Sequence, residues 1–243
     1  MPSKAADVAA AVIGCILVLL ALALIWIARV SITRDLYVSE MGAVGEPTAQ
    51  AFQIALLCIV VGGSLIAYAS RDIRSSVRLL GRWTPAVSLW IACGFFLVAS
   101  QVTCTSGCPV PYGPSFTWQD FTHILAAVLA FVAACWAMLQ VSFAHDARAL
   151  AIFSRVSGLS VGIIAATGGL LSLAGIAVGF GSRLEFVATT IAIAWVAVYG
   201  LAIAVRKGSA APGSSDTLGA SDAADASGAG SPLARDDVEQ AVR

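Results

Sequence analysis

The segment from Val8 to Val30 is VAAAVIGCILVLLALALIWIARV, and Arg29 is its only charged residue. A hydrocarbon core about 30 Å thick is crossed by roughly twenty helical residues. Backbone polar groups in hydrocarbon must be bonded within the protein, which leaves helices or closed barrels as spanning structures. The segment is too long and too continuously apolar for a barrel strand of about ten alternating residues. It therefore predicts a membrane-spanning helix.

Five further apolar runs follow the first. Hydrophobic residues make up 59% of the chain and the mean hydropathy is +0.89, far outside the range of an ordinary soluble domain. The first run exceeds the apolar core of a cleaved signal peptide, so we expect it to be retained. We predict an all-α integral membrane protein, a bundle of six transmembrane helices at 8–30, 51–70, 83–102, 121–143, 156–180 and 186–205.

Lysine and arginine are concentrated in alternate gaps between the runs. One side of the membrane would carry Lys4, Arg71, Arg74, Arg78, Arg82, Arg148, Arg155, Arg206 and Lys207. The opposite side would carry Arg34 and Arg183, with Arg29 at the end of the first run. Short cytoplasmic loops hold such an excess. With six crossings, residues 1–7 and the C-terminal segment are both predicted to be cytoplasmic.

The remaining composition adds three expectations. Segment 206–243 is dominated by Gly, Ser, Ala and Asp, and almost no large apolar residue is available for burial, so it is predicted to be a disordered cytoplasmic tail. Arginine and alanine are abundant beside rare lysine, which favours a bacterial plasma membrane as the location. The net charge of zero gives no indication of nucleic-acid binding.

Two cysteines lie in the second outward loop, at Cys104 and Cys108, followed by Pro109. The outer side of the membrane is oxidising, so a disulfide is the first interpretation. A metal pair is the alternative, although zinc would need further ligands and His123 is the only histidine nearby.

Three outward acids stand near the starts of predicted helices, where the helix dipole favours negative charge. Thr117 with Asp120, and Ser182 with Glu185, match the capping-box pattern of a hydroxyl followed by an acid three residues later. Glu46 precedes Pro47, a residue suited to the first helical position. Asp120 differs because His123 follows it on the same helix face.

The first outward loop holds polar residues that capping does not explain. Either they stay hydrated, or they turn inward over the bundle and form an outward-facing polar pocket. The candidate pocket residues are Asp35, Ser39, Glu40, Gly42, Gln53, Gln101, Asp120 and His123. Among them, His123, Asp120, Glu40 and Asp35 are the candidates for catalysis, and His123 is the candidate metal ligand.

These residues carry a family resemblance. Three motifs of the chain resemble the bacterial six-helix family called domain of unknown function 998. They are the stretch Ser39-Glu-Met-Gly42 with Pro47 and Phe52, the loop Cys104-x-x-x-Cys108-Pro109, and the helix start Asp120-x-x-His123. The first pattern is also distantly similar to six-helix membrane proteins of the damage-regulated autophagy modulator type. The resemblance implies a shared fold and a shared outer site, but it does not imply any particular reaction.

Three functions compete. The first is a non-enzymatic scaffold, sensor or lipid-headgroup-binding module, with membrane lipids as partners and no cofactor. The second is an intramembrane lipid hydrolase or transferase, in which one metal ion at the outer face or His123 acting as general base would supply the chemistry. The third is a small-molecule transporter. The sequence leaves open whether the chain forms a homo-oligomer or binds a protein partner. The geometry of the site distinguishes the three functions, because a catalytic His123 requires Asp35, Glu40 or Asp120 within hydrogen-bond or metal-ligand distance.

Overall fold

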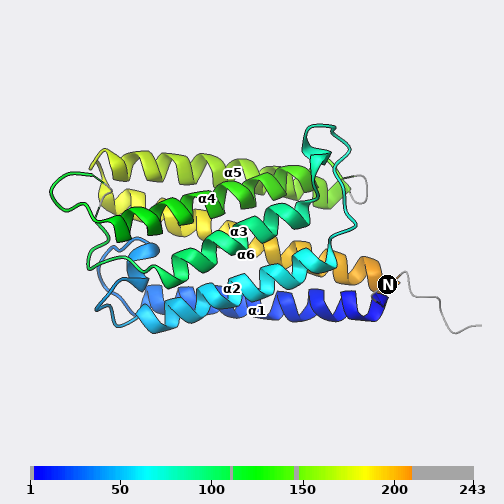
Figure 1. The fold of residues 1–243 in the computed structure, drawn as a ribbon, viewed down its shortest axis with the longest axis horizontal. Coiled ribbons are helices and arrows are strands. Elements are labelled where there is room, and N and C mark those ends of the chain that lie inside the picture. Colours follow the sequence, from blue (N-terminus) through cyan, green and yellow to red (C-terminus); the bar gives the residue numbers. More distant parts are fainter. Residues whose placement is uncertain (1–2, 110–111, 145–147, 210–243) are drawn as a thin grey trace, which may run out of the picture. The chain divides into compact units, whose positions relative to one another are not determined.

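The computed structural model describes residues 3–109, 112–144 and 148–209, which form a bundle of helices (Figure 1). The long helices are α1 (Lys4–Val30), α2 (Ala49–Ala69), α3 (Pro85–Gln101), α4 (Trp118–Val141), α5 (Arg148–Leu173) and α6 (Val178–Ser209). Two short 3-10 helices, η1 (Ser39–Gly42) and η2 (Leu80–Arg82), lie in the connections. Residues 206–209 of the predicted tail belong to α6, and its remainder lies outside the described residues.

The prediction of an all-α, multi-pass membrane protein is confirmed. Five of the helices are long and apolar enough to cross a membrane, and α3 is a shorter apolar helix of 17 residues. Large apolar side chains such as Leu19, Val132 and Leu170 are exposed on the bundle surface, where hydrocarbon would cover them.

The turn between α5 and α6 differs from the expected one. The helix predicted over 156–180 ends at Leu173, and the one predicted over 186–205 begins at Val178. Gly175 and Ala177 have positive φ angles of 66° and 51°, the left-handed conformation that commonly terminates a helix. The connection left at 181–185 between the two predicted helices is therefore part of α6.

Small residues let three helices approach closely. A Cβ atom on Gly14 of α1 would lie 2.7 Å from the Gly62 carbonyl oxygen of α2, and one on Gly62 would lie 2.8 Å from the Gly14 carbonyl oxygen. On α6, a Cβ atom on Gly200 would lie 2.6 Å from the Cys15 sulfur atom. Without a hydrophobic driving force between helices in lipid, such close packing supplies much of the association energy.

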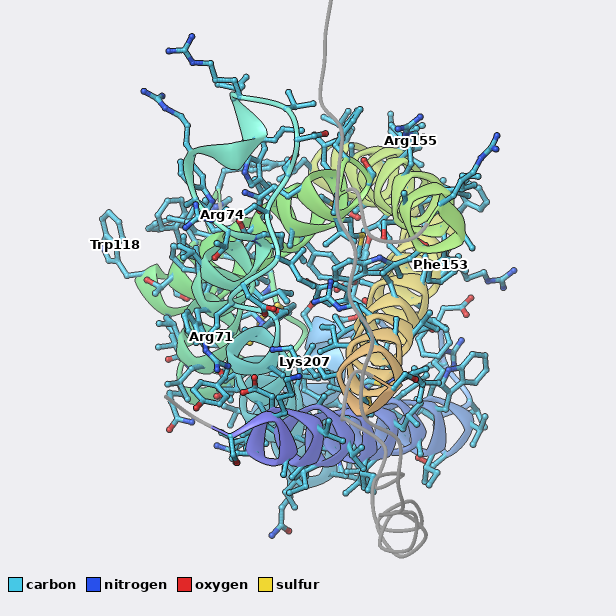
Figure 2. All side chains as sticks on the ribbon, turned by 90° about the vertical axis from the view of Figure 1, so that its right-hand side faces the viewer. Arg71, Arg74, Trp118, Phe153, Arg155 and Lys207 are labelled. Atoms are coloured by element: carbon cyan, nitrogen blue, oxygen red, sulfur yellow. A yellow bond between two sulfur atoms is a disulfide. The ribbon has the colours of Figure 1, made fainter. Side chains whose placement is uncertain are left out.

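The first and last helices meet at one end of the bundle. Asp7 of α1 accepts from Arg71 at 2.7 Å and from Lys207 of α6 at 2.8 Å, and Lys207 also pairs with Asp72 at 3.1 Å. Asp7 is 5% exposed, so its charge is held by these cations. We call this the basic end, and Figure 2 shows Arg71, Arg155 and Lys207 on it.

We call the opposite end of the bundle the loop end, formed by residues 31–48, 102–109, 112–117 and 174–177. The Val44 N–H donates to the Cys104 carbonyl oxygen at 3.0 Å, which joins the first and second loops. The Tyr112 hydroxyl donates to the Leu173 carbonyl oxygen, which joins the second loop to the end of α5.

We predict that Gly14→Val destabilises the protein by about 1–3 kcal/mol or more, because the added side chain would enter the α1–α2 contact. The matched control is Gly94→Ala on α3, where a Cβ atom meets nothing within 4 Å. This control removes a helix-interior glycine and is expected to stabilise by about 1 kcal/mol. Thermal unfolding in detergent measures both changes, and equal midpoints for the two variants would contradict the contact.

Candidate binding site at the loop end

A cavity of about 80 Å³ lies between α1, α2, α3, α4 and α6. Its walls are mainly apolar, with Leu56, Phe96 and Phe131 among them. The polar side chains that line it are Ser39, His123, Glu185 and Thr189, together with the free cysteine Cys93. At roughly 10–15 Å³ for one water, the space is several water molecules in size.

Glu185 lies inside the bundle on α6, and its carboxylate reaches the first loop. It accepts the Val38 N–H at 3.2 Å, and the backbone and hydroxyl of Ser39 also hydrogen-bond to it. No lysine, arginine or histidine of the described chain lies within ion-pair distance of this carboxylate. The residue is partly buried, and it lines the cavity.

The capping box predicted for Ser182 and Glu185 is wrong. Since α6 begins at Val178, both residues lie within the helix, and the Ser182 hydroxyl donates to the Gly179 carbonyl oxygen at 2.9 Å. Glu185 is therefore available to the first loop and the cavity rather than to its own helix start.

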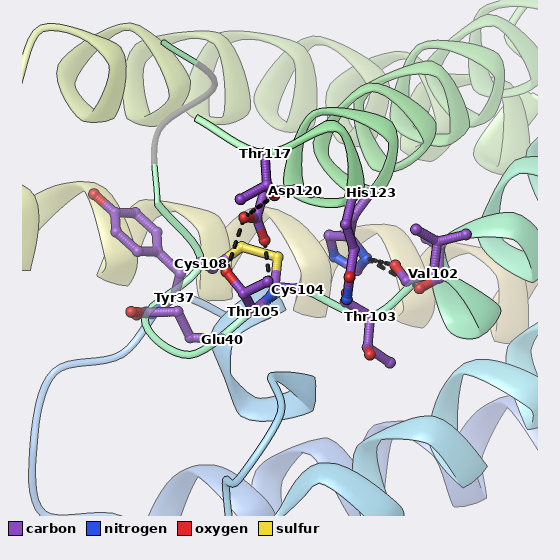
Figure 3. The surroundings of a disulfide bond; sticks show 12 residues. Tyr37, Glu40, Val102, Thr103, Cys104, Thr105, Cys108, Thr117, Asp120 and His123 are labelled. Atoms are coloured by element: carbon purple, nitrogen blue, oxygen red, sulfur yellow. Dashed lines mark hydrogen bonds between the residues drawn. A yellow bond between two sulfur atoms is a disulfide. The ribbon is translucent and has the colours of Figure 1, made fainter. Parts of the chain in front are cut away.

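The His123 ring on α4 is 4% exposed and lines the cavity. Its Nδ1 atom lies 3.0 Å from the Ala99 carbonyl oxygen and 2.7 Å from that of Val102, both at the end of α3 (Figure 3). Carbonyl oxygens only accept, so Nδ1 carries a proton, an assignment made from these partners. The Nε2 atom makes no hydrogen bond with the described part of the chain.

Asp120 is fully buried and holds the second loop. Its carboxylate accepts the Thr105 N–H at 2.7 Å and the Thr105 hydroxyl at 2.8 Å. Thr117 is the N-cap of α4 and accepts the Asp120 N–H at 3.0 Å, as the capping pattern predicted (Figure 3). Within the described residues Asp120 and His123 share no hydrogen bond, so the predicted catalytic couple is not assembled.

The structure joins Cys104 to Cys108 in a disulfide at the same place. The two sulfur atoms and an Asp120 oxygen lie within 4.8 Å of one another, a spacing that suits a metal ion. Cysteines bind metals as thiolates, so this donor set becomes available only after the bridge is reduced. His123 is not part of this group.

The acids of the first loop do not line the cavity. Asp35 is 40% exposed and pairs with Arg29 at 3.1 Å and with Arg183 at 3.2 Å. Glu40 is partly buried, and its carboxylate accepts the Tyr37 N–H at 2.7 Å.

The predicted cap at Glu46 is also wrong. Its carboxylate pairs with Arg34, and α2 begins only at Ala49, two residues after Pro47. The Glu46 carbonyl oxygen, not its side chain, accepts the Ala49 N–H at 3.1 Å. The N-cap of α2 is Thr48, whose hydroxyl donates to the Met41 carbonyl oxygen at 2.9 Å instead of capping.

The remaining pocket candidates have packing roles or lie outside. A Cβ atom on Gly42 would lie 2.5 Å from the Phe52 ring, so only glycine fits beneath that ring. Gln53 donates to the Ser100 carbonyl oxygen at 3.4 Å and lines, with Gly42 and His123, a second void of about 10 Å³. Gln101 is exposed and donates to the Ser100 hydroxyl at 3.0 Å.

The structure thus brings Ser39 and His123 of the predicted pocket to one cavity. It leaves Asp35, Glu40 and Asp120 outside that cavity. Sequence reasoning missed Thr189 and assigned Glu185 to capping. The sequence could have indicated both, because Glu185 and Thr189 are four residues apart and residues at that spacing share a helix face.

The disulfide yields a direct prediction. In a variant whose other cysteines (Cys15, Cys58, Cys93 and Cys135) are replaced by alanine, a maleimide should label no thiol before reduction and both Cys104 and Cys108 after it. Mass spectrometry of the labelled protein counts the thiols. Equal labelling before and after reduction would contradict the bridge.

Glu40 yields a prediction about pH. Burial raises the pKa of the Glu40 carboxyl, and the Glu46 charge adds to the rise, whereas the Tyr37 N–H opposes it. The folded protein therefore binds this proton more tightly than the unfolded chain, and stability falls as pH rises from about 4.5 through the raised pKa.

Glu40→Gln should consequently match the wild type at pH 4 and exceed its thermal stability at pH 7. The amide keeps an oxygen for the Tyr37 N–H. Unfolding midpoints measured across this range test the sign. A variant that becomes progressively less stable than the wild type with rising pH would refute it.

Comparison with known proteins gives one assignment. The family model described as Protein of unknown function (DUF998) matches residues 8–202, which run from within α1 into α6 and include the whole of α2, α3, α4 and α5. No significant match is found among curated proteins or solved structures. The matched region includes η1, the disulfide loop and every residue that lines the cavity. The chain therefore belongs to the DUF998 family of proteins of unknown function.

Proposed function

We propose that this protein is a six-span protein of the plasma membrane that binds a membrane lipid in the cavity, as a non-enzymatic sensor or scaffold. The observation that carries the proposal is the cavity itself. It is apolar along its length, and Ser39, His123 and Glu185 supply polar groups next to the loop end. An amphiphile has this same division into an apolar chain and a polar head.

The topology rests on α3 and on the basic end. At 1.5 Å per residue, the 17 residues of α3 span about 25 Å, close to the thickness of a thin hydrocarbon core. Counting α3 as a span puts the start of α1 and the end of α6 on one side. The ion pairs of Asp7 with Arg71 and Lys207 support that arrangement. The excess of arginine and lysine there favours the cytoplasmic side.

The geometry favours binding over catalysis. A nucleophile and its base lie within hydrogen-bond reach of each other in most covalent enzymes. In the described residues, the hydrogen bonds of His123 go only to the carbonyl oxygens of Ala99 and Val102. Each long helix of the described chain is one continuous element, so it lacks the interruption that forms many transporter sites.

A lipid hydrolase or transferase is the second candidate, because Ser39, His123 and Glu185 line one cavity. Its metal-dependent form would use the donors of Cys104, Cys108 and Asp120 after reduction. Product release from a labelled lipid by the wild type, lost in His123→Gln, would favour this candidate over simple binding.

Binding is tested by filling the cavity. Ala192 lines it, and Ala192→Leu should reduce labelling by a photoactivatable long-chain alcohol at least about tenfold, because the added methyl groups occupy the chain's space. The control Ala166→Leu makes the same replacement on the exposed surface of α5. Labelling in lipid nanodiscs is quantified by mass spectrometry, with peptides of the cavity wall scored. Equal cavity labelling of the two variants would overturn the proposal.

A further inference from the structure

Building on the proposed lipid binding, we propose that the cavity selects a single-chain amphiphile with an ammonium head group, and that Glu185 is its counter-ion. An acid inside a membrane-embedded bundle is costly, and such groups commonly mark a ligand or ion site. Glu185 meets this description, since it lines the cavity and no cation of the described chain pairs with it.

The nearby arginines are already paired and are not available to bind an anionic head group. Arg29 and Arg183 pair with Asp35, and Arg34 pairs with Glu46. No lysine or arginine is among the side chains that line the cavity. A phosphate or carboxylate head would therefore face Glu185 without a cation, and like charges in a site of low dielectric repel strongly.

Two further polar groups at the cavity, Thr189 and His123, can accept a hydrogen bond as well. Thr189 lies one helical turn beyond Glu185, and its hydroxyl oxygen is buried with no hydrogen-bond partner in the described chain. The neutral tautomer of His123 that donates from Nδ1 leaves Nε2 as an acceptor. A primary ammonium group has three N–H donors, equal in number to the acceptor groups of Glu185, Thr189 and His123.

The carboxylate retains capacity for such a ligand. It accepts bonds from Val38 and Ser39, and an ionised carboxylate has about four lone-pair positions. The rest of the cavity is apolar, with Phe96, Phe131 and Ile193 in its walls. Its volume of about 80 Å³ suits part of one hydrocarbon chain rather than two.

The test compares three probes of equal chain length in a neutral detergent: dodecylamine, dodecanol and dodecyl phosphate. Isothermal titration gives the dissociation constant of each for the wild type, Glu185→Gln, Thr189→Val and Asp35→Asn. We expect the wild type to bind dodecylamine at least about tenfold more tightly than dodecanol, and dodecyl phosphate most weakly. Glu185→Gln should remove that preference, and Thr189→Val should reduce amine affinity about threefold.

Asp35→Asn is the matched control, because it neutralises an exposed acid at the same end of the bundle. It should leave the amine preference unchanged, and a loss equal to that of Glu185→Gln would show surface adsorption and overturn the inference. Equal wild-type binding of amine and alcohol would refute the ammonium selectivity while leaving lipid binding intact. Binding of none of the three probes would refute both. Thr189→Val also tests the site if Glu185→Gln fails to fold.

Discussion

Hydrocarbon offers no partner for a backbone N–H or C=O group, and this constraint shapes the loop end. Where a helix stops, those of its last carbonyls and of the next loop's amides that are buried away from water need partners within the protein. Polar side chains of neighbouring helices supply them here. Asp120 accepts the Thr105 N–H, Glu185 accepts the Val38 N–H, and His123 donates to two carbonyl oxygens at the end of α3. The residues that are candidates for catalysis or binding thus first supply hydrogen-bond partners for the backbone of the loops and helix ends.

Sequence could predict the features that depend on local pattern. The long apolar runs predicted helices because a span must be continuous, and Thr117 with Asp120 predicted a helix start because capping involves residues three apart. The roles of Asp35 and Glu40 could not be predicted in this way. They depend on Arg183, on the course of the first loop and on the Tyr37 amide, which only folding brings together.

Glu185 shows how a correct rule can be applied at the wrong place. Ser182 and Glu185 have capping-box spacing, but the chain turns earlier, where Gly175 and Ala177 adopt positive φ. A glycine after an apolar run is itself a signal for a helix end, and for Gly175 it outweighs the hydroxyl–acid pattern. Since α6 begins at Val178, Glu185 lies seven residues inside it, about 10 Å along the axis. At that depth an acid has no helix-start N–H groups to cap.

That depth places the Glu185 carboxylate at two places at once, the first loop and the cavity. The same carboxylate bonds the Val38 amide of the first loop and lines the cavity, so a ligand that engages it also changes the electrostatic surroundings of η1. The loop is in turn held by Gly42 against the Phe52 ring and by the Val44 bond to the Cys104 carbonyl. In the proposed ligand-binding role, occupancy of the cavity would be linked energetically to the position of the first loop, and by thermodynamic reciprocity each would influence the other. A non-enzymatic lipid sensor needs this link and no reaction step.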